Sequence, residues 1–406
     1  MRRIDLKKAQ VANHSALRDI NRQIVLNHVR ERGPISRAEI ARTTAMQRST
    51  VSDIIDALII DGTIEEIGKG ESTGGRCPQL LRLHAGWAAA IGIDISPTRT
   101  SVATADITGH ILDLTEFPTD ADFEKTISRV IDCAVEFARK GRDRIEGIGV
   151  SMPGLVDPDR GTALYIPYFN WRNLNVAERI SAATGLRVSI DNDANAAALA
   201  ELWFGQPEVR DARDFIMVFV HEGLGAGIVF DRQVYRGAGG AAGEFGHMII
   251  GRQAPTACSC GSFACWEAFA SGGAAVARYF QLTGRNNNLS RLSFRQLIDR
   301  AITGEVPAQT ALLETAHNLS IGISNLIVGL SPEMIVIGGP ITRAWPLVAE
   351  VFCETVESSV RRGLPLASIV ASTLGESTTL MGALSLVLSG KFTYEAGSLT
   401  LANAMV

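Results

Sequence analysis

The hydrophobic pattern of this 406-residue chain changes near Trp87 and divides it in two. Before that point apolar residues recur at helical spacing. After it, short apolar runs alternate with amphipathic segments. A chain of this length exceeds one ordinary core, so two or three domains are expected. We expect a first domain over residues 1–84 and a second over 85–406.

The first domain is predicted to contain three helices followed by a β-hairpin. Helical spacing covers residues 17–32, and Gly33-Pro34 ends that helix. Ser36 and Glu39 match a capping box, which starts a short helix through about Arg42. After a tight turn, a third helix is expected at roughly 48–60.

The hairpin strands are predicted at 63–68 and 76–83, with a polar, Gly-rich turn between them. Three helices and a hairpin in this order are typical of a winged helix-turn-helix. Residues 1–84 hold 14 Lys and Arg against 10 Asp and Glu, whereas the remainder holds 25 against 33. A basic first domain on an acidic body suits a DNA-binding protein.

The first turn of the third helix is where such domains reach base edges. The residues expected to contact DNA are Arg48, Ser49, Thr50 and Ser52, with Arg76 beside the wing. Arginine can read guanine, hydroxyls can take bases or phosphates, and a flexible wing can enter the minor groove. The alternative is a small helical domain used for dimerisation.

The second domain is predicted to be α/β, because buried strand runs alternate with amphipathic helices and polar turns follow the strands. The main strand runs are 88–95, 102–107, 145–150, 188–190, 215–220, 226–230 and 335–337. Helices are expected at 126–139 and in an Ala-rich segment that ends at Trp203.

Three cysteines fall within eight residues, Cys258, Cys260 and Cys265, and His247 precedes them. Three thiols and one imidazole complete a closed tetrahedral zinc site, which is the structural rather than the catalytic type. Zinc there would fix a loop and contribute to folding. The alternative is three buried free thiols.

Polar residues suited to sugar hydroxyls gather where strands are expected to end. They are Asn192, Asp193, Glu244, His247 and Glu267. In a sugar kinase one aspartate acts as the base toward the attacking hydroxyl, and Asp193 is the candidate. The alternative for Asp193 is a helix N-cap.

Four motifs resemble those of one family, the ROK family, named for repressors, open reading frames and kinases. Residues 151–157 look like its (S/G)xPGxVD turn, 191–196 like NDANA, 243–247 like GExGH, and 258–267 like the zinc signature CxCGxxxCxE. The chain is similar to the family's xylose, N-acetylglucosamine and glucose-type repressors. Residues 72–76 resemble the linker of those repressors. Kinase members generally lack this N-terminal extension.

The resemblance implies a two-lobed, actin-like (ribonuclease H-like) ATPase fold for the second domain. One lobe would cover roughly 85–200 plus the C-terminal helix, and the other 201–380. Zinc would be held by His247, Cys258, Cys260 and Cys265. His247 would also contact the sugar, because one ring nitrogen can bind zinc while the other faces a hydroxyl.

Three departures distinguish this chain from the family's kinases. The kinases carry Asp-x-Gly-Gly-Thr in their first phosphate turn, whereas residues 94–98 here lack both glycines and contain Pro97, which has no N–H to offer a phosphate. The second phosphate loop places Glu222 beside the expected phosphate, where its charge is repulsive. Tyr168 stands where the family has a sugar-contacting asparagine.

We therefore expect a sugar-responsive repressor and not an enzyme, with no catalytic residue. Its partners would be double-stranded operator DNA and a sugar or sugar phosphate that releases or modulates it. We expect a cytoplasmic homodimer or dimer of dimers, with no membrane span. The alternatives are an active ATP-dependent sugar kinase with an appended DNA-binding domain, and a protein silenced by a partner transporter.

Overall fold

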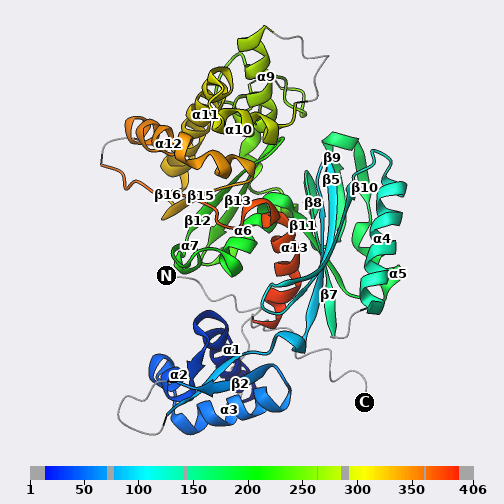
Figure 1. Ribbon diagram of the computed structural model, residues 1–406, viewed down its shortest axis with the longest axis vertical. Coiled ribbons are helices and arrows are strands. Elements are labelled where there is room, and N and C mark those ends of the chain that lie inside the picture. Colours follow the sequence, from blue (N-terminus) through cyan, green and yellow to red (C-terminus); the bar gives the residue numbers. More distant parts are fainter. Residues whose placement is uncertain are drawn as a thin grey trace.

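The computed structural model describes residues 14–70, 77–140, 144–262, 264–284, 292–360 and 363–392 (Figure 1). It consists of two α/β lobes and a small, mainly helical domain near the N-terminus, which Figure 1 shows below the lobes. This is the expected fold class. Within the described residues, no helix combines the length and apolar character that a membrane span requires.

The N-terminal domain contains the three expected helices and a small sheet. The helices are α1 (His14–Arg32), α2 (Arg37–Thr44) and α3 (Arg48–Ile60), and the strands are β1 (Ile35–Ser36), β2 (Ile64–Lys69) and β3 (Gln79–Leu83). Ser36 caps α2, because its hydroxyl accepts a hydrogen bond from the Glu39 amide at 3.3 Å. The buried core includes Val25, Ile40, Val51 and Leu81.

Three details of this domain differ from the sequence prediction. Helix α2 continues two residues beyond Arg42, and Ala45 in the left-handed region ends it. Strand β3 begins at Gln79 rather than at residue 76. The sheet also gains β1, which pairs antiparallel with β3. The wing residues 71–76, with Arg76 among them, lie outside the described residues.

The first lobe is built on a five-stranded sheet of order β11-β7-β4-β5-β6. Its strands are β4 (Ala89–Ile95), β5 (Arg99–Asp106), β6 (Ile111–Pro118), β7 (Ile145–Met152) and β11 (Val188–Asn192). Helices α4 (Phe123–Lys140) and α5 (Val176–Thr184) cover one face (Figure 1). A smaller sheet joins β8 (Leu155–Asp157), β9 (Thr162–Ile166) and β10 (Trp171–Leu174).

The second lobe repeats this sheet, in the order β14-β13-β12-β15-β16. The strands are β12 (Phe215–Val220), β13 (Leu224–Phe230), β14 (Gln233–Val234), β15 (Met334–Gly338) and β16 (Ser368–Ala371). The helices are α7 (Pro207–Asp211), α8 (Trp266–Ala270), α9 (Gly272–Thr283), α10 (Phe294–Ile302), α11 (Val306–Leu330) and α12 (Trp345–Ser359). In both lobes an antiparallel hairpin is followed by parallel strands, as in an internal duplication.

Helices α6 (Asp193–Phe204) and α13 (Thr378–Leu388) pack against each other between the two sheets (Figure 1). Alanines fill much of the buried surface of α6, and a Cβ on Gly382 of α13 would collide with the carbonyl oxygen of Ala196. Only small residues permit so close an approach. Helix α6 contacts β12 and β13, while α13 contacts β4 and β7, so the pair joins the lobes.

The N-terminal domain contacts the body where these two helices end. The Arg30 guanidinium of α1 lies 3.9 Å from the ring centroid of Trp203 in the last turn of α6. It also lies 5.2 Å from the centroid of Phe392, which follows α13. The Asn27 side chain donates to the Phe392 carbonyl at 2.8 Å. Arg30 and Asn27 therefore connect α1 to the ends of both interlobe helices.

Candidate functional site

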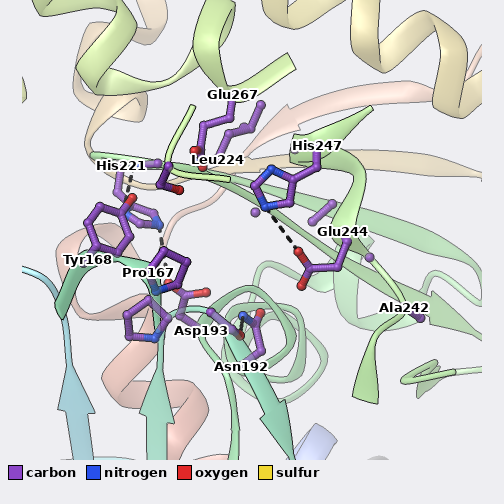
Figure 2. A pocket seen from close by; sticks show the side chains of 18 residues that line it. Pro167, Tyr168, Asn192, Asp193, His221, Leu224, Ala242, Glu244, His247 and Glu267 are labelled. Atoms are coloured by element: carbon purple, nitrogen blue, oxygen red, sulfur yellow. Dashed lines mark hydrogen bonds and ion pairs between the residues drawn. The ribbon is translucent and has the colours of Figure 1, made fainter. Parts of the chain in front are cut away.

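A polar pocket lies between the lobes, beside the ends of β11 and β12 (Figure 2). All five residues expected to contact sugar line it: Asn192, Asp193, Glu244, His247 and Glu267. The structure thus brings together side chains that are separated by up to 75 positions in the sequence. The first lobe adds Pro153, Gly154, Pro167 and Tyr168 to the lining, and the second adds His221 and Gly223.

Asn192 and Asp193 stand at the start of α6 and have different tasks. Asn192 is the N-cap, since its side-chain oxygen accepts from the Ala194 amide at 2.8 Å. Its amide nitrogen donates to the Gly154 carbonyl at 2.9 Å, which ties α6 to the first lobe. The alternative assignment of Asp193 as the N-cap is therefore wrong, and Asp193 presents its carboxylate to the pocket.

His221 is the cation that faces this carboxylate. Its Nε2 lies 3.4 Å from Asp193 Oδ2, and its Nδ1 lies 3.5 Å from Glu222 Oε2. Burial disfavours the charged imidazole, yet the hydrogen bonds to Asp193 and Glu222 outweigh burial and raise the pKa of His221 to about 10. The two carboxylates therefore favour the charged form of His221, while the Gly223 amide lies 3.3 Å from its Nδ1.

Glu244 and His247 come from one short 3-10 helix, Glu244–His247, that follows the second lobe's hairpin. Their side chains approach within 3.5 Å, between Glu244 Oε2 and His247 Nε2 (Figure 2). The other ring nitrogen, His247 Nδ1, lies 3.4 Å from the Cys258 sulfur. One imidazole thus faces the pocket with one nitrogen and the thiols with the other.

The three thiols and His247 form a compact cluster that could hold a metal ion. One ligand atom from each of the four residues lies within 4.8 Å of the others, and the sulfurs of Cys260 and Cys265 are 3.5 Å apart. Cys258 and Cys265 are buried, while Cys260 is exposed. A tight turn brings the first two together, because the Gly261 amide donates to the Cys258 carbonyl at 3.0 Å.

Glu267 links the cluster to the pocket. It lies in the first turn of α8, two residues after Cys265, which occupies the N-cap position. Its Oε1 is 3.3 Å from the Cys258 sulfur, and its Oε2 accepts from the Leu224 amide at 3.1 Å. The position of this carboxylate therefore depends on the conformation of the cysteine loop.

The turn between β4 and β5, which is the first phosphate turn of the family's kinases, is closed by its own hydrogen bonds. The Ser96 amide and hydroxyl both donate to the Arg99 carbonyl, at 2.9 and 2.7 Å. The Arg99 amide donates back to the Ser96 hydroxyl at 3.2 Å. Because Pro97 has no N–H, the amides of three of the four turn residues are unavailable to a phosphate.

An ion pair between Arg236 and Asp191 joins the two lobes, and the sequence gives no signal of it. Arg236 donates to Asp191 Oδ2 from Nε at 2.8 Å and from Nη2 at 2.7 Å. Asp191 is buried at the end of β11, and Arg236 begins the loop that leads to Glu244. Two charge-assisted hydrogen bonds to one carboxylate oxygen hold the two segments together.

The pairing of His221 with Asp193 was also not predicted, although the His-Glu sequence in a glycine-rich loop was a signal.

The residues expected to contact DNA lie on the N-terminal part of α3, away from the pocket. Arg48 and Ser49 are exposed, whereas Thr50 and Ser52 are half-buried. Arg48 and Ser49 are thus free to meet a large partner. The fifth residue of this set, Arg76, is outside the described residues.

The raised pKa of His221 predicts a specific pH dependence of stability. A folded-state pKa of about 10 means that the charged pair stabilises the protein fully near pH 6.5 and below, and is lost as the pH rises toward 10. His221→Gln should therefore cost on the order of 1–3 kcal/mol at pH 6.5 and progressively less toward pH 10. Urea denaturation of both proteins across this range measures the difference. A cost that stays constant or grows with pH would contradict the assignment.

Comparison with known proteins identifies the family. The ROK family model matches residues 90–389. The xylose repressor of Caldicellulosiruptor bescii is 31% identical over 95% of this chain and 99% of its own length. The crystal structure of a ROK family transcriptional regulator, a homologue of the Escherichia coli MLC protein, superposes with a TM-score of 0.76 at 26% identity, covering 93% of this chain and 97% of that one.

A ROK family glucokinase from Streptomyces griseus, solved with glucose and AMPPNP, also superposes, with a TM-score of 0.67 at 29% identity. It covers 74% of this chain and 100% of its own, so a quarter of this chain has no counterpart in the kinase. The regulators match nearly the whole chain, which supports a regulator rather than a kinase. The chain belongs to the ROK family.

Proposed function

We propose that this protein is a sugar-responsive transcriptional repressor that acts in the cytoplasm. Residues 1–84 form a winged helix-turn-helix domain that binds double-stranded operator DNA, and residues 85–406 form the sugar-sensing body. One observation supports the proposal most strongly. The kinase-like body has a pocket lined by carboxylate, amide and imidazole groups, but the amides of its first phosphate turn are used in hydrogen bonds within the turn. Such a body can bind a sugar without an arrangement for transferring phosphate to it.

The pocket suits a polyhydroxy ligand. Carboxylates accept from hydroxyl groups, and the Asn192 amide and His247 ring can donate to them. These groups come from both lobes, so a sugar between them favours a closed arrangement of the lobes. A ligand shifts a conformational equilibrium only through different affinities for the two states, and a pocket shared by two lobes provides that difference.

The cysteine cluster fits a structural Zn²⁺ ion. Tetrahedral zinc with Zn–S bonds of about 2.3 Å requires ligand atoms roughly 3.8 Å apart, which agrees with four atoms within 4.8 Å of one another. His247, Cys258, Cys260 and Cys265 would hold it, leaving no open coordination position. Zinc would fix the loop that positions His247 and Glu267, and would otherwise take no part in ligand chemistry.

Helix α6 offers a route from the sugar to the DNA-binding domain. Its N-terminus carries Asn192 and Asp193 in the pocket, and its last turn places Trp203 against Arg30 of α1. A helix packed closely along its length moves as a unit. A change in lobe closure therefore displaces the surface on which Arg30 rests, and with it α1 of the DNA-binding domain.

The protein is proposed to bind DNA as a homodimer or a dimer of dimers. Paired helix-turn-helix domains read two half-sites related by two-fold symmetry, so the operator should be an inverted repeat. Displacement of the two domains by a sugar would change their spacing and weaken binding to both half-sites together. The effector belongs to the sugars or sugar phosphates.

Operator binding tests the function directly. On operator fragments selected from the host genome, Arg48→Ala should weaken affinity by roughly 10- to 100-fold, because an arginine contact to a base is worth about 1–3 kcal/mol. Fluorescence anisotropy measures the affinity. The control is Arg139→Ala, which removes the same charge from an exposed position on α4. Fragments bound without sequence preference, or equal loss in both variants, would contradict the proposal.

Removing one thiol tests the metal site. Wild-type protein should contain about one zinc per chain by plasma mass spectrometry, and Cys265→Ser should lose it and bind sugar roughly tenfold or more weakly, since Glu267 and His247 lose their support. Cys353→Ser, an exposed cysteine of α12, is the matched control. A Cys265→Ser protein that retains zinc, or that loses zinc with unchanged sugar affinity, would refute this role.

The Arg30 contact tests the route. Arg30→Gln should retain both sugar binding and DNA binding, while the sugar-induced change in operator affinity shrinks several-fold, because coupling free energies are typically 1–3 kcal/mol. Arg32→Gln, an exposed arginine in the same last turn of α1, is the control. The measurement is operator affinity with and without sugar. An unchanged response in Arg30→Gln would exclude this contact from the coupling.

A further inference from the structure

We propose that a cavity between the N-terminal domain and the body binds a small organic anion, in which a phosphate or carboxylate group is joined to an apolar portion. The cavity is separate from the interlobe pocket, and no described residue lines both. The inference therefore goes beyond the proposed sugar response and concerns a second ligand at a second site.

The cavity has a volume of about 470 Å³, within the roughly 300–1,000 Å³ that small-molecule sites occupy. Residues of α1, β3, α6 and α7 surround it, together with the end of α13 and the segment that follows. Its apolar wall includes Trp203, Phe204, Leu388 and Phe392. A ligand of this size would therefore contact the N-terminal domain and the body at once.

The charged side chains of the lining are all arginines. Arg30 of α1 and Arg210 in the last turn of α7 line the cavity, as does Arg82, which is paired with Glu65 at 2.7 Å. Nε and Nη1 of Arg30 and Nε of Arg210 are shielded from solvent and have no hydrogen-bond partner within the described part of the chain. Buried charged donors are costly to leave unpaired. A ligand in the cavity would supply the acceptors that these nitrogens lack.

A further arginine, Arg232, adds positive charge beside the cavity. Glu31 Oε1 accepts from Arg30 Nη2 at 2.8 Å and lies 3.9 Å from Arg232 Nη2. Burial lowers the pKa of Arg30, Glu31 opposes this shift, and the charges of Arg210 and Arg232 add to it. Three guanidinium groups thus surround one carboxylate. Water would accept from the donors but leave the excess positive charge, whereas an oxyanion would do both.

Size and polarity together define the ligand. A DNA duplex is too large for this cavity, and a bare inorganic ion would leave the apolar wall without a contact. An anion with an apolar portion meets both requirements. Because it would lie beside the contact of Arg30 with Trp203, it should hold α1 against the body and change operator affinity. This last effect rests on the proposed function, whereas the binding site does not.

Calorimetric titration of the full-length, zinc-loaded protein with phenyl phosphate tests the site. Inorganic phosphate and the neutral benzyl alcohol should each bind roughly tenfold or more weakly than phenyl phosphate, because each lacks one of the two features. Arg210→Gln and Arg30→Gln should each weaken phenyl phosphate binding by roughly tenfold or more, since hydrogen bonds between charged groups are the strong ones. Arg32→Gln, an exposed arginine outside the lining, should leave it unchanged.

Three results would overturn the inference. They are the absence of saturable phenyl phosphate binding, equal affinity for benzyl alcohol, and wild-type affinity in a folded Arg210→Gln or Arg30→Gln protein with normal zinc content. In operator titrations, saturating phenyl phosphate should change the affinity of the wild type several-fold and that of Arg210→Gln much less. A protein that binds phenyl phosphate as expected but binds no operator would remove the repressor function and leave this site in place.

Discussion

The close packing of α6 against its neighbours is the constraint on which the rest of the structure depends. Its alanines pack closely against α13, and position 382 of α13 must be glycine because a Cβ there would collide with the backbone of Ala196. This packing fixes the helix between the two sheets. Asn192 and Asp193 consequently meet the second lobe's polar residues at one end of α6, and Trp203 meets Arg30 at the other. The interlobe pocket and the N-terminal domain thus share one structural element.

Backbone chemistry explains why this kinase-like body serves regulation. Phosphate binding needs free amides, and the β4–β5 turn uses those of Ser96 and Arg99 internally, while Pro97 has none. The candidate base Asp193 is retained, but it is paired with the His221 imidazolium, which is itself paired with Glu222. A sugar hydroxyl would meet an engaged carboxylate there, rather than a free base beside a nucleotide.

Much of the secondary structure and of the cysteine cluster could be predicted from the sequence, because hydrophobic periodicity and motifs are set by residues close together in the chain. Helix α3 has the predicted bounds, and the four cluster residues come together as the motif implied. The sequence did not indicate that Asn192 would cap α6 in place of Asp193, because both residues suit a cap. Three contacts could not be predicted from the sequence, because each joins segments that only the folded chain brings together. They are His221 with Asp193, Arg236 with Asp191, and Arg30 with Trp203.

Reciprocal linkage between sugar and operator is the most direct test of the central claim. If one conformational equilibrium connects the pocket to the DNA-binding domain, operator DNA must change sugar affinity by the same factor by which sugar changes operator affinity. Calorimetric titration of the sugar into free protein and into the protein–operator complex gives this factor. The sugar should bind more weakly to the complex than to the free protein. Equal sugar affinity with and without operator would contradict it.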